Sequence, residues 1–423
     1  MNARACAWAL MLLALPTLSA AQSAEPPPAP YLSDSIDAGD ENADPPRRKL
    51  VQWNEFEGPY ITGRLGGTFL YDYAAYDQDD DSKTQMSLNP QSKVRDSRFY
   101  IGGAFPKIPG LRYSFAYMFD GATDDWFFRT TGLQYEVPKL HGRLFLGRQK
   151  EGYSTSKVMT GTDGWGMERS TSNDAFLPIL ADGLKWTGNS PDGRLVYNLG
   201  YYMDELSNKE SFNKNDSQFI SRAVWLPFLL SNPEQVLHLA VGYRYGKSND
   251  GFLQYRSKPE ANPAQDYAID TGKFAAQHSD MAMVEAYYRP GPLMFGMEYI
   301  FNQVASRETG DPFFHGGEVF VAYTPTGEVR PYNTKGGYFG RISPNRTVFE
   351  GGPGAWELVL RYSYTDLDSE SIQGGKFWRI TPGVNWHMND NVRLEFFYGY
   401  GMLDRFNTEG ATHFFQTRIQ FQL

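Results

Sequence analysis

The chain has 423 residues, a formal net charge of −9 and an aromatic content of 15%. Its mean hydropathy of −0.50, with no apolar run of about 18 residues beyond the N-terminal stretch, excludes a protein built from transmembrane helices. The acidic balance argues against nucleic acid as a partner. The length allows two soluble domains or one large barrel.

Residues 1–21 have the pattern of a secretory signal peptide. Arg4 precedes an apolar run over residues 5–15, and the small residues Ser19, Ala20 and Ala21 follow. The single cysteine, Cys6, lies inside this stretch, so the mature chain has no thiol and no disulfide. A secreted chain without disulfides needs another source of stability, and a closed barrel in lipid supplies one.

Residues 22–58 are rich in Pro, Ala, Asp and Glu. Such a composition buries little apolar surface, so we expect a flexible periplasmic segment. The transmembrane barrel domain is then expected over residues 59–423.

From about residue 60 onward, apolar and polar residues alternate in runs of about ten. Leu358, Leu360 and Tyr362, for example, alternate with Arg361 and Ser363. This period of two predicts strands with one apolar and one polar face, and their length and aromatic content indicate an antiparallel transmembrane β-barrel. The sixteen expected strands cover residues 60–73, 93–105, 111–119, 125–137, 141–148, 181–187, 194–202, 216–226, 236–245, 278–289, 293–303, 314–323, 356–366, 377–387, 391–401 and 412–421. A soluble sandwich would have shorter strands, and a propeller would show a repeat of about 40 residues.

The connections between these strands alternate in length. Short turns are expected at residues 106–110, 138–140, 290–292 and 388–390, and long connections follow the first, fifth and ninth strands. Short turns on one side and long loops on the other place both termini in the periplasm. The connection over residues 324–355 breaks this rule, because a short turn is expected there.

If the apolar faces meet lipid, the polar faces line the lumen. The cations assigned inward are Arg64, Arg98, Arg112, Arg194, Arg222, Arg244, Arg361, Arg379, Arg393 and Arg418. The anions assigned inward are Asp72, Asp96, Glu285, Glu298, Glu318, Glu357 and Glu395. The wall is therefore modestly basic although the chain is acidic. Two interpretations stay open: the arginines select anions, or they pair with these carboxylates and brace the wall.

The sequence offers no pattern for catalysis or metal binding. Its six histidines lack the spacing of a zinc site, and no nucleophile lies in a recognisable catalytic pattern. We therefore expect no enzymatic activity, no catalytic residue, no metal and no cofactor.

Three blocks resemble the phosphate-selective porin O and P family of Gram-negative outer membranes. They are LFLGRQKEGYSTSKVMTGTDGWGMERS at 144–170, TPTGEVRPYNTKGGYFGRISP at 324–344, and GAWELVLRYSYTDLD at 354–368 followed by GVNWHMNDNVRLEFFY at 383–398. The resemblance implies a sixteen-stranded, trimeric porin in which the loop after the fifth strand, residues 149–180, folds inward as a constriction. It also implies that Lys157 is the constriction lysine, and Arg169 lies in the same block.

The resulting hypothesis is an outer-membrane porin that lets small anions, with phosphate or polyphosphate as candidates, diffuse passively. Its expected partners are small anionic solutes, outer-membrane lipid and lipopolysaccharide, and two further copies of the chain. The predicted pore-lining or anion-binding residues are Lys157, Arg169, Arg64, Arg98, Arg222, Arg244, Arg361, Arg379, Arg393 and Arg418. The alternatives are a general or other solute-specific porin of the same fold, and a barrel enzyme or structural surface protein with a plugged lumen.

Overall fold

The computed structural model describes residues 54–121, 123–203, 215–227 and 235–423. The predicted signal peptide and residues 22–53 of the predicted periplasmic segment lie outside the described residues. The last residues of that segment form a short strand, β1 (Glu55–Glu57), which pairs with the start of β2 (Thr62–Gln78) and places Glu55 opposite Arg64.

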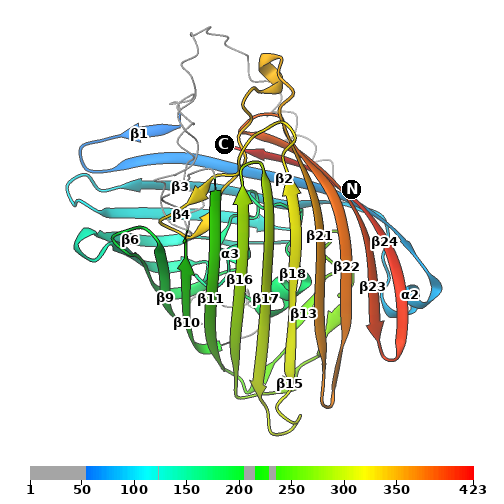
Figure 1. The fold of residues 1–423 in the computed structure, drawn as a ribbon. Coiled ribbons are helices and arrows are strands. Elements are labelled where there is room, and N and C mark those ends of the chain that lie inside the picture. Colours follow the sequence, from blue (N-terminus) through cyan, green and yellow to red (C-terminus); the bar gives the residue numbers. More distant parts are fainter. Residues whose placement is uncertain (1–53, 122, 204–214, 228–234) are drawn as a thin grey trace. The chain divides into compact units, whose positions relative to one another are not determined.

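Among the described residues, sixteen antiparallel strands pair in sequence order, and the last, β24, pairs with the first, β2 (Figure 1). Register pairs such as Asp72 with Arg418 close this ring. The ring strands are β2, β3 (Gln91–Ala104), β4 (Leu111–Asp120), β6 (Thr131–Val137), β7 (Gly142–Gln149), β8 (Ala181–Asn189), β9 (Leu195–Met203), β10 (Asn215–Trp225), β11 (Gln235–Ser248), β16 (His278–Pro290), β17 (Leu293–Ala305), β18 (Phe313–Tyr323), β21 (Ala355–Ser369), β22 (Ile372–His387), β23 (Val392–Arg405) and β24 (Thr408–Gln422). The predicted all-β barrel of about sixteen strands is confirmed.

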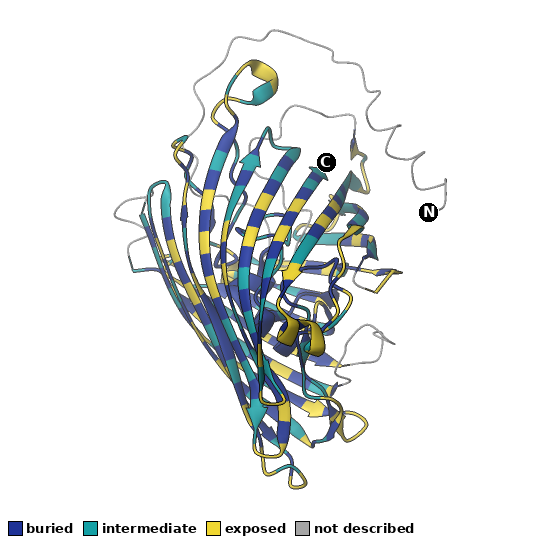
Figure 2. Cartoon of the chain, turned by 90° about the vertical axis from the view of Figure 1, so that its right-hand side faces the viewer, coloured by how far each residue is buried: buried dark blue, intermediate teal, exposed yellow. Residues whose placement is uncertain are grey.

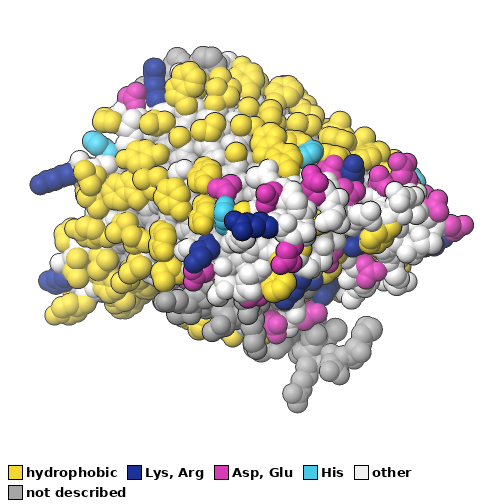
Figure 3. Space-filling view, turned by 90° about the horizontal axis from the view of Figure 1, so that it is seen from below, with side chains coloured by type: hydrophobic (Ala, Val, Ile, Leu, Met, Phe, Trp, Pro, Cys, Tyr) yellow, Lys and Arg dark blue, Asp and Glu magenta, His cyan; other side chains and the backbone are white. Residues whose placement is uncertain are grey.

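The two faces of each strand differ as the alternation predicts. In β21, Leu358, Leu360 and Tyr362 are exposed on the outside, while Arg361 and Ser363 are buried inside the ring. Figure 2 shows this alternation as stripes of exposed and buried residues along the strands. Viewed from below, hydrophobic side chains cover a broad part of the surface and charged side chains gather on the remainder (Figure 3). No helix among the described residues is long and apolar enough to cross a membrane.

Two strands depart from regular pairing. The predicted strand at 125–137 is divided into β5 (Asp125–Phe128) and β6, both of which pair with β4. In β3, the register against β2 shifts between Val94 and Asp96, so Arg95 is the extra residue of a bulge. A bulge interrupts the period of two and redirects a side chain.

The barrel has two ends. The C-terminal residue Leu423 and the start of β2 lie at one end, which we call the terminal end. There the backbone N–H of Leu423 donates to the carbonyl oxygen of Gly67. The turns at this end are mostly short. One contains the 3-10 helix η1 (Pro138–Leu140), and another has Gly291 at a φ of 70° between two prolines. At the other end, α2 (Asp80–Gln85) follows β2, and Asp79 caps it by accepting from the backbone N–H of Ser82.

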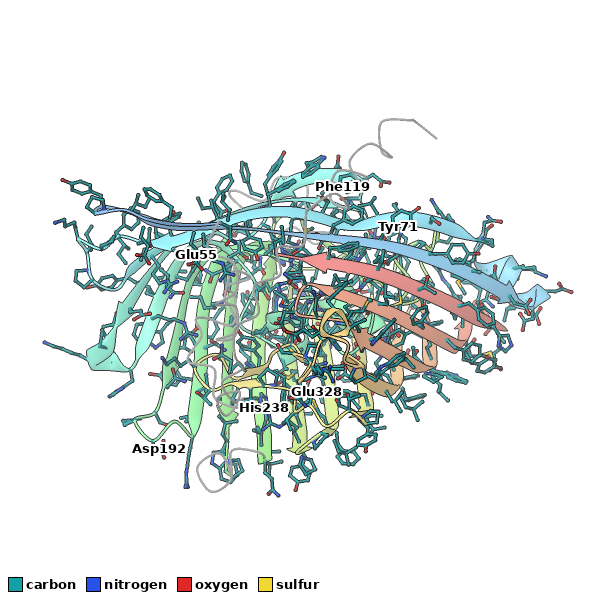
Figure 4. The ribbon with its side chains drawn as sticks, turned by 90° about the horizontal axis from the view of Figure 1, so that it is seen from above. Glu55, Tyr71, Phe119, Asp192, His238 and Glu328 are labelled. Atoms are coloured by element: carbon teal, nitrogen blue, oxygen red, sulfur yellow. The ribbon has the colours of Figure 1, made fainter. Side chains whose placement is uncertain are left out.

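Three connections fold into the space inside the ring. The loop at 150–180 carries α3 (Thr155–Val158) and α4 (Thr171–Phe176). The loop at 249–277 carries two small paired units, β12 (Phe252–Leu253) with β15 (Phe274–Ala275) and β13 (Arg256–Ser257) with β14 (Ile269–Asp270). The connection at 324–354 carries β19 (Tyr332–Asn333), β20 (Tyr338–Phe339) and the 3-10 helix η2 (Val348–Glu350). Side chains therefore occupy much of the enclosed space when it is viewed from above (Figure 4).

Candidate constriction and pore lining

Carboxylates on the barrel wall hold the loop at 150–180 inside the lumen. Glu285 of β16 accepts from the backbone N–H and the hydroxyl of Thr155, at 2.7 and 2.8 Å. Glu298 of β17 accepts from the Asn173 amide at 2.7 Å. These hydrogen bonds are buried, so breaking them would be costly, and they fix the path of the loop. The inward-folded loop that the family resemblance implied is therefore present.

Lys157 lies on α3, the first turn of this loop. The hydroxyl of Ser154 caps the helix by accepting from the Lys157 backbone N–H at 3.1 Å. The Lys157 ammonium is buried and donates to Asp174 at 3.2 Å. Burial lowers the pKa of Lys157, and the positive charge of Arg169 adds to that effect while Asp174 opposes it.

Arg169 lies nearby in the same loop, and backbone carbonyls position it. Its guanidinium donates to the carbonyl oxygen of Ser156 at 2.7 Å and to that of Met159 at 3.0 Å. Burial lowers the pKa of Arg169, which still leaves a guanidinium charged at neutral pH. Because these partners are neutral, Arg169 contributes positive charge to its surroundings.

Glu168 fastens the other side of the loop to the wall. It accepts from Arg95 of β3 at 2.8 Å and from Arg418 of β24 at 2.5 Å. Burial alone would raise the pKa of Glu168, but the two guanidinium groups outweigh it and lower this pKa to about 2. Arg418 also donates to Asp72 at 2.6 Å, so two carboxylates share this arginine.

The loop at 249–277 meets the first loop inside the ring through Glu260. The Glu260 carboxylate accepts from Arg361 of β21 at 2.5 Å and from the backbone N–H of Thr171 at 3.1 Å. Arg379 of β22 donates to the carbonyl oxygen of Pro259 at 2.8 Å. One carboxylate therefore connects both lumenal loops to the wall.

The two loops and the wall enclose a cavity of about 520 Å³. Among the described residues that line it, eleven are Lys or Arg and seven are Asp or Glu, a formal excess of four positive charges. The cations are Arg95, Arg98, Arg129, Lys150, Lys157, Arg169, Arg256, Lys258, Lys273, Arg361 and Arg418. The anions are Asp96, Asp120, Glu168, Asp174, Asp250, Glu260 and Glu318. The lining is thus positive within a chain whose net charge is negative.

The predicted site residues fall into three groups. Five of them line the cavity: Lys157, Arg169, Arg98, Arg361 and Arg418. Four are buried in contacts elsewhere on the inner wall: Arg222 with Glu285, Arg244 with Glu151, Arg379 with Pro259, and Arg393 with Glu395. Arg64 lies near the terminal end, 3.9 Å from Glu55.

The expected inward position of Arg194 is wrong, because this residue is exposed in the turn before β9.

Several cavity residues escaped the sequence analysis. Arg95 reaches the lumen because of the β3 bulge, which strict alternation does not reveal. Arg129 lies in the gap between β5 and β6. Arg256 and Lys258 belong to the loop at 249–277, and no sequence signal indicated that this loop turns inward.

The connection at 324–354 enters the lumen from the terminal end. Arg330 donates to Glu357 at 2.7 Å and to the carbonyl oxygen of Asp163 in the first lumenal loop at 2.5 Å. On another part of the wall, Arg222 donates to the carbonyl oxygen of Gly337 at 3.1 Å. A short periplasmic turn was expected at this place, whereas the additional length forms a hairpin inside the ring.

Comparison with known proteins connects this architecture to a family. The model of the family described as phosphate-selective porin O and P matches residues 64–423. Porin O of Pseudomonas aeruginosa is 24% identical over 404 residues, which cover 85% of this chain and 87% of that protein. An uncharacterised protein of Caulobacter vibrioides is 29% identical over 279 residues, which cover 63% of this chain and about half, 54%, of that protein.

Solved structures share the fold at low sequence identity. An anion-selective porin from Comamonas acidovorans aligns with a TM-score of 0.51 and 13% identity, covering 86% of this chain and 100% of that one. A trimer form of OmpT, an outer-membrane protein of Vibrio cholerae, aligns with a TM-score of 0.51 and 12% identity, covering 86% and 100%. The resemblance identified in the sequence is confirmed: the chain belongs to the phosphate-selective porin O and P family of the Gram-negative outer membrane.

Proposed function

We propose that the chain forms a passive outer-membrane channel whose cavity between the two lumenal loops favours small anions. The observation that carries the proposal is the positive excess of the cavity lining, eleven cations against seven anions among the described residues. A charged lining in a narrow, partly desolvated passage lowers the free energy of a counter-ion more than the same charges do in bulk water. Family membership indicates a channel rather than an enzyme.

The excess charge belongs mainly to the loops. Arg95, Arg98 and Arg418 on the wall each form an ion pair with a carboxylate. Arg169 donates to backbone carbonyls, and Lys258 donates to the backbone carbonyl of Asn262 at 3.2 Å. The wall arginines therefore brace the barrel, and the loop cations supply the attraction, which combines the two interpretations that the sequence left open.

Reversal potentials test this proposal. The purified protein is placed in a planar bilayer that separates two salt concentrations. The reversal potential should then have the sign of an anion-selective channel. Arg169→Gln and Lys157→Gln should each reduce the anion-to-cation permeability ratio, by roughly twofold. Lys247→Gln is the matched control, because Lys247 is exposed on the outer side of β11 and does not line the cavity. Cation selectivity of the unmodified channel would refute the proposal.

Family membership makes phosphate or polyphosphate one candidate for the transported anion, and an organic anion is the other candidate. If phosphate is the preferred solute, inorganic phosphate should reduce the chloride current at low concentration. A general or other solute-specific porin of this fold would show no such block.

We further propose that the terminal end faces the periplasm and that lipopolysaccharide surrounds the opposite end. We also propose that three copies of the chain assemble into a trimer. The trimer form of the Vibrio cholerae protein, which shares the fold, supports the proposed assembly. The mass of the detergent-solubilised complex, measured by light scattering, tests it: a mass of one chain would exclude the trimer.

A further inference from the structure

We propose that the cavity prefers organic anions with an apolar or aromatic body, such as an aromatic monocarboxylate, over inorganic phosphate. This inference depends on the proposed anion channel and specifies the class of solute that its cavity takes.

Three large apolar side chains on the lumenal loops, rather than on the outer face of the ring, are partly exposed. Ile179, Phe252 and Tyr267 are 38, 48 and 36% exposed, and all three line the cavity from the two lumenal loops. An apolar surface left in contact with water in a lumen costs free energy unless a ligand covers it, so it indicates a binding surface for apolar groups.

Cations stand beside this apolar surface. The guanidinium of Arg256 lies over the ring of Tyr267, 4.3 Å from its centroid, and Lys258 and Lys273 line the same cavity. Burial lowers the pKa of Lys258, and the neighbouring cations Lys93 and Arg95 lower it further. A carboxylate that enters would relieve this repulsion while its apolar body covers the exposed apolar side chains of the lining.

The wall arginines of the lining offer little uncompensated charge to a compact, multiply charged oxyanion. Arg95 and Arg418 are already bonded to Glu168, and Arg361 is bonded to Glu260. Because the pKa of Glu168 is about 2, this carboxylate keeps its negative charge at physiological pH. A phosphate dianion that contacts these arginines also meets the carboxylates paired with them, whereas a monoanion needs only a loop cation as its partner.

The size of the cavity agrees with an organic solute. A volume of about 520 Å³ lies within the range of about 300–1,000 Å³ that is typical of small-molecule sites with mixed apolar and polar linings. A phosphate ion would leave most of the apolar lining uncovered.

Block of the chloride current in planar bilayers, measured with the full-length protein, tests the inference. Acetate, butyrate, hexanoate, benzoate and inorganic phosphate are compared by the concentration that halves the current. We expect this concentration to fall by about two- to fourfold for each added methylene, and benzoate to block at a lower concentration than phosphate. The series needs no variant and so does not depend on the folding of one.

Two substitutions locate the effect. Phe252→Ala and Tyr267→Ala should raise the half-blocking concentration of benzoate by roughly fivefold and leave that of acetate unchanged. Phe219→Ala is the matched control, because Phe219 is exposed on the outer side of β10. The substitution should alter neither value.

The outcomes separate this inference from the proposed function. Tighter block by phosphate than by benzoate, or equal block by acetate and hexanoate, would overturn the inference while the channel stays anion-selective. Equal effects of the two loop substitutions on acetate and benzoate would also overturn it. A cation-selective reversal potential would instead overturn the proposed function itself.

Discussion

Glu168 sets the balance of charge in the cavity. It is the carboxylate that Arg95 and Arg418 share, so it neutralises part of the wall and holds the lumenal loop against that wall. The two guanidinium groups lower the pKa of this buried carboxylate to about 2, so it stays ionised. Its contribution to stability is therefore present above the ordinary pKa of a glutamate and is lost as the pH falls through about 2.

We predict that Glu168→Gln increases the anion-to-cation permeability ratio, by roughly twofold or more, because it removes one negative charge and leaves two arginines less neutralised. Reversal potentials in a salt gradient measure the ratio. Asp192→Asn is the control, since Asp192 is an exposed residue of the turn between β8 and β9, at the rim of the ring (Figure 4). The assignment of Glu168 would be wrong if both variants shifted the ratio equally.

At the scale of elements, the hairpin β19–β20 distinguishes this barrel from one with short turns at the terminal end. A hydrogen bond of 2.8 Å joins the hydroxyl of Tyr332 in the hairpin to the imidazole of His238 in β11. Asn189 of β8 donates to the carbonyl oxygen of Thr334 at 2.9 Å. Tyr332, Tyr338 and Phe339 are buried with Trp165 of the first loop in one apolar cluster. The hairpin therefore obstructs part of the lumen and packs against the first lumenal loop.

Replacing residues 332–339 by a short Gly-Ser linker should raise the single-channel conductance by roughly twofold, because it removes an ordered obstacle from the lumen. Single-channel recordings in planar bilayers measure this change. Shortening residues 346–352 around η2 is the control, because these residues are partly or fully exposed and do not belong to the apolar cluster. An unchanged or lower conductance of the linker variant would show that the hairpin does not restrict the passage.

At the scale of the whole molecule, the barrel depends on the difference between its outer and inner faces. Leu360 is 49% exposed on the outer side of β21, whereas its neighbour Arg361 is buried and bonded to Glu260. Lipid contacts the outward-facing side chains, and the lumenal loops pack against the inward-facing ones. A charged side chain is therefore tolerated only on the inner face.

Leu360→Arg should therefore destabilise the barrel by about 2–4 kcal/mol, because an arginine in contact with lipid near the middle of the membrane loses its hydration. Denaturant-induced unfolding from phospholipid vesicles measures the free energy of unfolding. Gln373→Arg, near the exposed end of the β21–β22 hairpin, should cost less than about 1 kcal/mol. Equal costs at the two positions would contradict the assignment of the outer face to lipid.

The sequence alone determined the ring. Each of the sixteen ring strands overlaps a range that alternation predicted, although the range 125–137 is divided into β5 and β6. Alternation locates the strands because a strand between lipid and the polar lumen must alternate, and this requirement is local in the chain. The same alternation assigned Asp72, Glu285 and Arg418 to the inner wall, where they are buried.

Tertiary structure decided the site. Three features of the site depend on partners more than 70 residues away in the sequence. They are the bulge at Arg95, the inward path of the loop that carries Lys258, and the hairpin around Gly337. Glu168 is such a partner for Arg95, and Arg222 is one for Gly337. Irregular loops have no period from which a direction can be inferred, and a bulge shifts the period that strands have. The sequence therefore could not show which arginines brace the wall and which cations line the cavity. That division depends on contacts with carboxylates and carbonyls that are distant in the sequence and close only in the closed ring.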